Sequence, residues 1–481
     1  MSVRRGTILR AVTRHELRVL WRDGTARLAL LALIACLAYG VWTGTRWSAF
    51  QEDSVRAGVQ REAEVFGGLE EQAREWAAQG ATASPDAFAL HPGYIGLFYP
   101  RFAGLPPGPA APLSVGQSDI RPYYYWVNGE RRDSWLDQEE LENPQNLLAG
   151  RFDLGFVVVF LLPIILLGLS FDLLSREREQ GTLQLIASQP VPMGTLTVGK
   201  ILARWLLVMA ALLLVMIPAG LWMGLVEAAP GALLLWTGAV GGYALFWLLL
   251  AAAVNTVTRG SAANGILLLS AWLLLVVVVP PILNRTVAFV HPLPPRAELI
   301  ETTRALETEV RVDPGALVER YYDMHPDLRP AGFDPERYNF PLFWTAIQRE
   351  VDLGMEAILS REREAIEAQE RLARGVAALS PAVLLQNLGD ALAGTDLPRN
   401  RRFLEAVLDF HEEHRSFFER RAYGHRTLLV EEYQQMPTFR GRADDLEPRI
   451  FAGVPFGLLL LAWVATIGFL LRQRIRRIDP G

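Results

Sequence analysis

The chain has 481 residues, of which 51% are hydrophobic and 21% are charged, and its formal net charge is −5. This mixture is typical of a membrane protein with sizeable polar domains and argues against an ordinary soluble enzyme. The negative net charge gives no support for nucleic-acid binding. A single cysteine, Cys36, excludes a disulfide framework and a cysteine-based metal site.

The first 27 residues predict a basic amphipathic helix. An apolar stripe of Ala11, Leu17, Leu20 and Trp21 lies between arginines, so we expect the helix to lie on the inner face of a membrane. The arginines are Arg4, Arg5, Arg10, Arg14, Arg18, Arg22 and Arg27. The alternative, a cleaved signal peptide, requires a shorter charged region and a small-residue cleavage site. Residues 28–45 then form the first membrane span.

Residues 46–151 predict a polar domain between the first two spans. Trp47–Gln79 has helical spacing with alternating charges, which predicts a long helix rising from the membrane. The Pro- and Gly-rich stretch LPPGPAAPLSVGQSDIRPYYYWVNGE predicts a loop. Its aromatic residues are candidates for contact with a partner or a substrate: Tyr123, Tyr124, Tyr125 and Trp126. The alternative is that they pack the loop or lie at the membrane interface.

Five further apolar segments are each long enough to cross the hydrocarbon core of a bilayer. They are residues 152–174, 201–226, 232–254, 263–283 and 451–471. Basic residues in the short loops and in the tail, residues 472–481, place both termini in the cytoplasm by the positive-inside rule. Residues 46–151 and 284–450 then lie outside. The sequence predicts an all-α polytopic membrane protein with six transmembrane helices and two mainly helical extracytoplasmic insertions.

The second insertion, residues 284–450, contains four stretches of helical periodicity. They are residues 296–311, 341–375, 381–392 and 401–435. The last stretch carries His411, Glu412, His414 and His425. His411 and His414 share a helix face but lack the spacing of a zinc motif, so we expect a solvated charged helix there rather than a metal site.

A polar insert, residues 175–200, separates the second and third spans. Ser175 is expected to cap a short helix, and Glu177 and Glu179 suit the positive end of its dipole. Gly181 inside this helix costs about 1 kcal/mol relative to Ala, which suggests a partner packed closely against it. The alternative is that Gly181 ends one turn and starts another. A helix of this kind lies flat on the membrane surface and can contact a soluble partner, although an ordinary interfacial helix has the same pattern.

The insert and both polar domains resemble a known family. The pattern Glu177-Arg178-Glu179-x-Gly181-Thr182-Leu183, followed by Pro190 and then Gly199-Lys200, resembles the first cytoplasmic loop of ABC-2 type transporter permeases. SVGQSD before Pro122, and SPAVLLQNLGDALAGTD before Phe403, resemble the DUF3526-type subgroup with large extracytoplasmic insertions. The resemblance implies that the loop is a coupling helix contacting a separate ATPase subunit through Glu177, Arg178, Glu179, Gly181, Thr182 and Leu183.

The same resemblance implies a permease subunit of an exporter in a bacterial inner membrane, paired with a second, identical or related permease subunit. ATP and Mg are expected on the partner ATPase, and no cofactor or catalytic residue is expected on this chain. Gly194-x-x-x-x-Gly199-Lys200 imitates a nucleotide-binding loop, but Ile201 stands where a Ser or Thr must hold magnesium. Two alternatives stay open: mechanotransmission to a periplasmic partner, and a membrane-anchored periplasmic scaffold or enzyme without a transport role.

Overall fold

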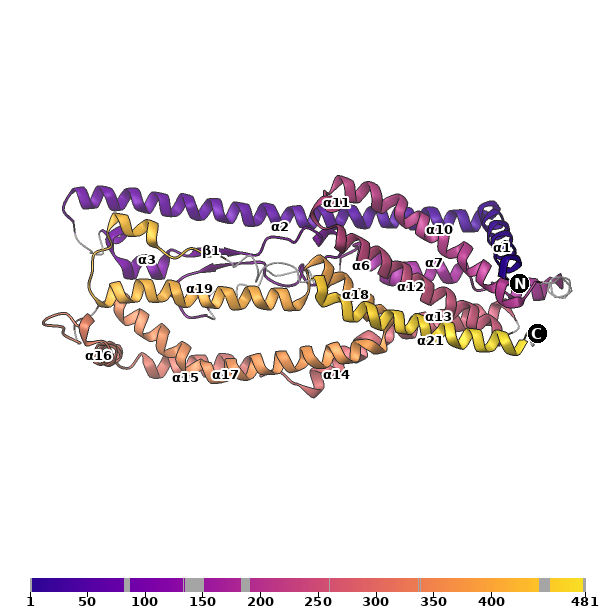
Figure 1. The fold of residues 1–481 in the computed structure, drawn as a ribbon. Helices are drawn as coiled ribbons and strands as arrows, with labels where there is room; N and C mark the ends of the chain where they lie inside the picture. Colours follow the sequence, from indigo (N-terminus) through magenta and orange to yellow (C-terminus); the bar gives the residue numbers. More distant parts are fainter. Residues whose placement is uncertain are drawn as a thin grey trace.

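The computed structural model describes residues 2–81, 87–132, 134, 151–182, 191–258, 260–335, 337, 339–440 and 450–478. These residues form an elongated, mainly helical rod (Figure 1). Apolar helices occupy the end that carries both termini, here called the terminal end. The two insertions lie side by side at the other end and are here called the distal domain, residues 46–132 and 291–440.

Five helical segments are long and apolar enough to cross a membrane. They are Gly24–Ala78 (α2), Met193–Trp222 (α10), Pro230–Val257 (α12), Ser261–Val290 and Phe451–Arg477. The fourth comprises α13 (Ser261–Trp272), a π-helical stretch (Leu273–Val278) and α14 (Val279–Val290), and the fifth consists of a 3-10 turn followed by most of α21 (Val454–Ile478). The all-α polytopic fold is thus confirmed.

The predicted span 152–174 is a shorter apolar helix, Leu154–Gly168. It consists of α6 (Leu154–Phe156), a π-helical stretch (Val157–Leu161) and α7 (Leu162–Gly168). The π-helical stretch ends just before Pro163, whose ring nitrogen carries no hydrogen to donate. At 1.5 Å per residue this helix is about 22 Å long, less than a hydrocarbon core of about 30 Å. The chain then leaves the helix in a series of turns before residue 175.

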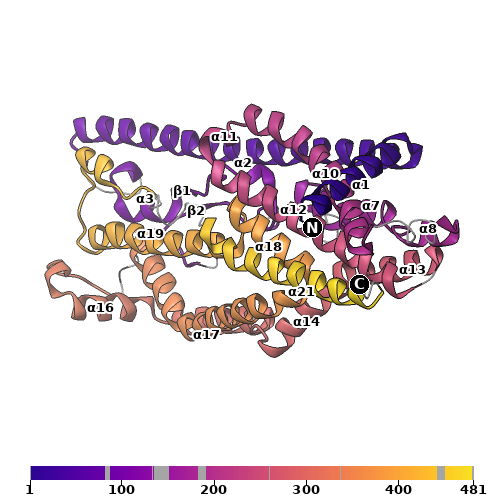
Figure 2. The ribbon, with the colours of Figure 1, turned by 45° about the vertical axis from the view of Figure 1, so that its right-hand side comes forward.

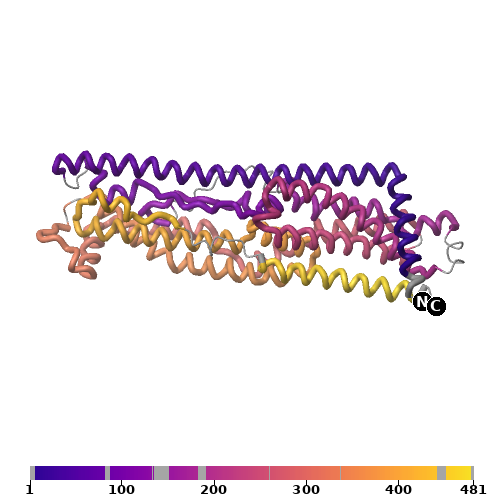
Figure 3. The backbone as a smooth tube through the Cα atoms, turned by 45° about the horizontal axis from the view of Figure 1, so that its top comes forward, coloured from indigo at the N-terminus to yellow at the C-terminus, as the bar shows by residue number. Residues whose placement is uncertain are grey.

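The first span and the long helix predicted after it are one unbroken helix, α2, of 55 residues. Asp23 begins it by accepting hydrogen bonds from the backbone N–H groups of Thr25 and Ala26. Its length is about 80 Å at 1.5 Å per residue, so it runs from the terminal end into the distal domain. The preceding helix, α1 (Ser2–Arg22), bends away and crosses the end of the bundle (Figure 3).

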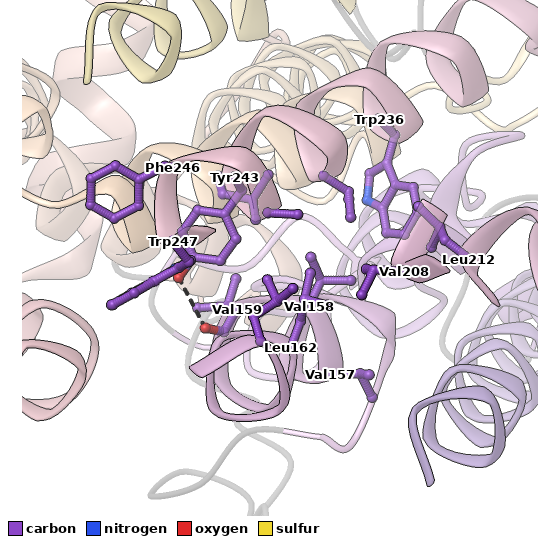
Figure 4. Packing of buried hydrophobic residues seen from close by; sticks show 14 of the residues in the cluster. Val157, Val158, Val159, Leu162, Val208, Leu212, Trp236, Tyr243, Phe246 and Trp247 are labelled. Atoms are coloured by element: carbon purple, nitrogen blue, oxygen red, sulfur yellow. Dashed lines mark hydrogen bonds between the residues drawn. The ribbon is translucent and has the colours of Figure 1, made fainter. Parts of the chain in front are cut away.

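Aromatic side chains of α12 fill the centre of the bundle. Tyr243, Phe246 and Trp247 are buried and pack in the same cluster as the π-helical stretch (Figure 4). The Tyr243 hydroxyl donates a hydrogen bond to the carbonyl oxygen of Val159, at 3.1 Å. Leucines of α18 (Pro381–Ala393) join this same cluster. The distal domain is therefore packed into the bundle and not merely tethered to it.

The helices of the second insertion follow the predicted ranges closely. They are α15 (Arg296–Val310), α17 (Phe340–Val376), α18 and α19 (Leu397–Tyr423). The sequence pattern did not predict α16 (Pro314–Met324). The last predicted helix, residues 401–435, extends beyond the end of α19 at Tyr423. The chain turns at Gly424 and His425, whose φ is +49°, before a 3-10 turn at Val430–Gln435.

Smaller elements complete the fold. In the first insertion, α3 (Pro92–Phe98) packs on α19, and two short strands pair antiparallel, the second of them within the stretch predicted as a loop. These strands are β1 (Arg101–Gly104) and β2 (Tyr124–Val127), with Arg101 opposite Val127. Short helices lie at Ser175–Glu179 (α8) and Leu225–Ala228 (α11), and 3-10 turns at Phe88–Leu90, Ala111–Leu113, Pro326–Leu328, Ala377–Leu379 and Ile450–Gly453.

The aromatic residues at 123–126, which were predicted as candidates for contact with a partner or a substrate, contribute to packing. Tyr123 and Tyr125 are buried, and Tyr125 stacks on Phe403 with ring centroids 5.8 Å apart. Tyr124 and Trp126 are half-buried beside Phe102. A role for these aromatic residues in partner or substrate contact stays a prediction.

The expectation of a solvated helix around His411 and His414 is wrong. Both imidazoles are fully buried, and they lie within hydrogen-bond distance of the carbonyl oxygens of Glu130 and Gly96, at 2.8 and 3.3 Å. The helix that carries them packs between α3, β2 and α17. Burial lowers the pKa of His414 to about 3, so this side chain is neutral.

Glycines on α2 allow other backbones to approach closely. A Cβ at Gly44 would lie 2.4 Å from the carbonyl oxygen of Pro112, whereas one at Gly67 would meet nothing within 4 Å. We therefore expect Gly44→Ala to lower the free energy of unfolding by about 1–3 kcal/mol, because backbone cannot yield as a side chain can. Gly67→Ala on the same helix should raise it by roughly 0.5–1 kcal/mol. Denaturant titration in detergent measures both, and effects of the same sign would contradict this packing.

Candidate functional site

The conspicuous polar site of the bundle lies at the terminal end, around helix α8, which is next to α13 in Figure 2. α8 follows the short apolar helix and precedes α10, so it occupies the predicted surface loop. Ser175 is its first residue and not its cap: the Ser175 hydroxyl lies 2.7 Å from that of Ser261 and accepts a hydrogen bond from Asn264. Leu183 and Pro190, which belong to the same sequence motif, lie outside the described residues.

A buried lysine organises one side of the loop. Lys200, in the second turn of α10, is only 3% exposed. Its ammonium group donates to the carbonyl oxygen of Leu173 at 2.9 Å, pairs with Glu177, and lies 3.6 Å from the carboxylate of Glu16 on α1. A buried cation is tolerated when such partners surround it.

Arg204 lies one turn further along α10 and extends this arrangement. Its guanidinium donates to the carbonyl oxygen of Leu169 at 2.6 Å and to Glu16 at 3.2 Å. The carbonyl oxygens of Leu169 and Leu173 are available because both residues lie in the turns between α7, which ends at Gly168, and α8, which begins at Ser175. We call Glu16, Glu177, Lys200 and Arg204 the ion cluster. It joins α1, the loop, the end of the short helix and α10.

Gly199 explains how α1 comes close enough to contribute Glu16. A Cβ at Gly199 would lie 2.6 Å from a methyl carbon of Val12 on α1. The Gly199-Lys200 pair therefore combines a close helix crossing with a buried charge. The string that imitates a nucleotide-binding loop lies within helix α10, where its lysine is occupied by two carboxylates.

Two asparagines hold the start of α8 from the other side. The Asn255 side chain of α12 accepts hydrogen bonds from the backbone N–H groups of Leu174 and Ser175, at 3.0 and 3.3 Å. Asn255 thus satisfies N–H groups that begin α8, which the sequence had assigned to Ser175. Asn264 of α13 donates to the same Asn255 oxygen at 3.0 Å. Both asparagines are fully buried.

Three of the four consecutive charged residues of the loop anchor it to three different helices. Glu177 pairs with Lys200 of α10. Arg178 donates to the carbonyl oxygen of Thr258, just after α12, at 2.8 Å. The Glu179 carboxylate accepts from the backbone N–H and the hydroxyl of Ser261, at 2.6 and 2.9 Å, where α13 begins. These hydrogen bonds hold the pKa of Glu179 below its usual value.

The remaining surface of the loop faces solvent. Arg176, Gln180, Gly181 and Thr182 are exposed. Gly181 lies just beyond α8 with a φ of +70°, and a Cβ there would meet nothing within 4 Å. The expectation that Gly181 lies inside the helix is therefore wrong. It ends the helix in the left-handed conformation that glycine adopts without strain.

The sequence did not single out three of the residues that build this site, namely Glu16, Asn255 and Asn264. The signal was present, because polar side chains within or beside apolar helices are costly unless they serve a specific contact. Their partners depend on which helices are neighbours, and the sequence pattern does not specify that.

Two family models match the chain. The model described as ABC-2 family transporter protein matches residues 134–283, which contain the loop, Lys200 and both asparagines. The model described as a domain of unknown function (DUF3526) matches residues 296–442, which include helices α15 to α19 of the distal domain. No curated protein matches the chain. The fold and the first match define an ABC-2 transporter permease. With the second match, the chain belongs to the DUF3526-type group of that family.

Removing one partner from the ion cluster should be costly, because the remaining charges stay buried. We expect Lys200→Met to lower the free energy of unfolding by about 3–5 kcal/mol, and Lys200→Met combined with Glu177→Gln to recover part of this loss. Arg176→Ala is the control, since Arg176 is exposed and lies 3.9 Å from Asp172; it should change stability by less than about 0.5 kcal/mol. Equal effects of Lys200→Met and Arg176→Ala would show that the cluster is not a structural constraint.

Proposed function

We propose that this ABC-2 permease is the membrane-spanning subunit of an exporter, driven by a separate ATPase subunit that contacts the loop between the short apolar helix and α10. The observation that supports this proposal most strongly is the anchoring of the loop. Glu177, Arg178 and Glu179 connect to α10, to the residue after α12 and to α13, while a neighbouring polar surface stays exposed. A force applied to this surface would act on three spans together.

The buried contacts divide the loop motif into two parts. Glu177 and Arg178 serve the inner side, and Glu179 lies at the surface but is bonded to Ser261. Arg176, Gln180, Gly181 and Thr182 form the surface that we propose as the main ATPase contact. ATP and Mg would bind to that partner. In a complete transporter, a second permease subunit would pair with this chain in the bilayer of a bacterial inner membrane.

Mechanotransmission is the second candidate, and α2 favours it. This helix runs unbroken from the terminal end into the distal domain, and α18 packs into the same apolar cluster as the spans. A rigid connection of this kind could carry movement of the spans to a periplasmic partner of the distal domain, without passage of a substrate between the spans.

The contact proposal predicts distinct effects for exposed loop residues. Arg176→Glu and Thr182→Trp should weaken ATPase association and coupled ATP hydrolysis by about tenfold, because they alter charge and shape on the exposed surface. They avoid the positive φ of Gly181 and the buried carboxylate of Glu177, whose substitution would also disturb the fold. Arg371→Glu on the distal domain, where the side chain is 67% exposed, is the matched control. Co-purification and turnover with the co-expressed ATPase in nanodiscs measure the effects, and wild-type values for both loop variants would refute the proposed contact.

The orientation proposed here places both termini and the loop in the cytoplasm. In a Cys36→Ala background, a membrane-impermeant thiol reagent applied to cells with a permeabilised outer membrane should label Arg371→Cys and Ile120→Cys. Both positions are exposed on the distal domain. Thr182→Cys, exposed on the loop, should react only after the inner membrane is opened. Labelling of Thr182→Cys in cells with an intact inner membrane would reverse the orientation.

A further inference from the structure

A second buried polar cluster lies where the distal domain meets the spans. It comprises Ser114, Asp153, Gln386, Asp390 and Thr395, and we call it the latch. Ser114 begins the SVGQSD stretch, Asp153 caps α6, and the other three belong to the stretch SPAVLLQNLGDALAGTD. The two stretches that carry the DUF3526 resemblance therefore meet each other, and both meet the start of an apolar helix.

Two neighbouring residues of the first stretch each hold one carboxyl group. The Ser114 hydroxyl donates to Asp390 at 2.6 Å, and the Val115 backbone N–H donates to Asp153 at 2.7 Å. The Gln386 amide donates to the same Asp390 oxygen at 2.8 Å, and the Thr395 hydroxyl donates to the Ser114 carbonyl oxygen at 3.1 Å. Asp390 on α18 is thus bonded to Ser114, and the next residue, Val115, is bonded to Asp153 where the chain enters the spans.

The charges around Asp390 are unbalanced. Asp153 and Asp390 are 5% and 6% exposed, and Asp396 is a further carboxylate facing the same region. Within the described ranges, no salt bridge joins Asp390 to a cation. The nearby guanidinium of Arg399 donates to the carbonyl oxygens of Gly394 and Pro106. The neighbouring parts of α2 and α12 contribute Gly40 and Trp236, which are uncharged. Burial and the charge of Asp153 both favour the protonated form of Asp390.

The latch is close to space that water can enter. One cavity, of about 410 Å³ including the part open to solvent, is lined by Thr395 and Gln117 among others. Another, of about 220 Å³ by the same measure, is lined by Ser114 and Gln386, which both hydrogen-bond to Asp390. Gly116 closes the latch between them, since a Cβ there would lie 2.5 Å from the Thr395 hydroxyl and 2.7 Å from an Asp390 oxygen.

We propose that Asp390 is a proton-binding site whose protonation keeps the distal domain latched to the spans. In the closed latch the carboxyl group is neutral and hydrogen-bonded to Ser114 and Gln386. When it gives its proton to water, the carboxylate is repelled by Asp153, and the latch opens so that Asp390 becomes hydrated. This inference concerns the distal junction and is independent of the ATPase contact proposed for the loop.

The direction of the pH dependence follows from the two states of Asp390. Burial and, to a smaller extent, Asp153 raise the pKa of Asp390 from 3.8 to about 7 in the closed latch. In the open latch, hydrated Asp390 should titrate near its ordinary value of about 3.9. The closed state holds the proton more tightly, so protonation favours it. Between these two pKa values, the equilibrium constant for opening should rise about tenfold per pH unit, and it should level off above about pH 7.

Thiol accessibility at Val115 tests this directly. Val115 is 2% exposed, so Val115→Cys in a Cys36→Ala background should react only when the latch opens. Its labelling rate is divided by that of Ile120→Cys, which is 48% exposed on the same segment, so that the titration of the thiol itself cancels. In nanodiscs this ratio should rise about tenfold per unit between about pH 5 and pH 7 and then level off. With Asp390→Asn added, it should stay low at every pH.

Two results would overturn the proposal. One is a wild-type ratio that does not change with pH, and the other is an Asp390→Asn ratio that keeps the wild-type profile. Asp153→Asn gives a separate check if Asp390→Asn does not fold. It removes the repelling charge, so the pH at which the ratio levels off should move to a lower value. An unchanged profile in Asp153→Asn would assign the titration to another group and contradict the latch.

Discussion

The burial of a single ammonium group fixes the terminal end of this permease. Lys200 is the only lysine of the chain, and it is almost completely enclosed. Removing a cation from water is so costly that each of its partners must be in place, namely two carboxylates and a backbone carbonyl group. These partners come from α1, from α8 and from the turns between α7 and α8. The position of the loop and the crossing of α1 over α10 are therefore tied to one electrostatic requirement.

The latch, where the distal domain meets the spans, contains buried carboxyl groups instead of a buried cation. There, buried carboxyl groups are held by hydroxyl, amide and backbone donors without a salt bridge to Asp390 among the described residues. A pair that is charged and balanced holds its geometry over a wide pH range, whereas a buried carboxyl group without a cation depends on its proton. The bundle is thus held near the termini by the charge-balanced ion cluster. Near the distal domain it is held by the latch, which we propose to depend on the protonation of Asp390. The long helix α2 extends past both, and its glycines let the backbones of Leu154 and Pro112 approach it closely.

Hydrophobic periodicity was enough to predict most of the helices and the membrane character. Apart from residues 152–174, the predicted spans fall on long apolar helices, and α15, α17 and α18 lie close to their predicted ranges, because each depends on a local pattern of apolar residues. The predictions are wrong where contacts between residues far apart in the sequence determine the local structure. Tyr124–Val127 becomes a strand because Arg101–Gly104 pairs with it, and His411 and His414 are buried because α3 and β2 cover their helix. The loop motif was found by its residue order, but its inner contacts were not, since Asn255, Asn264 and Glu16 reach it from other helices.

The central claim is that the loop and the spans it is bonded to move as one unit when nucleotide binds to the partner ATPase. Spin labels at Gln180 and at Ala262 test it, because both positions are exposed. Gln180 directly follows α8 and Ala262 lies on α13, and Glu179 connects these two helices through Ser261. Electron–electron distance measurements on the complex in nanodiscs, with and without nucleotide, give the change between them. The account predicts that this distance stays the same while the distance from Gln180 to a label at Arg371 on the distal domain changes. A shift between Gln180 and Ala262 on nucleotide binding would mean that the loop moves independently of the spans, which contradicts the account.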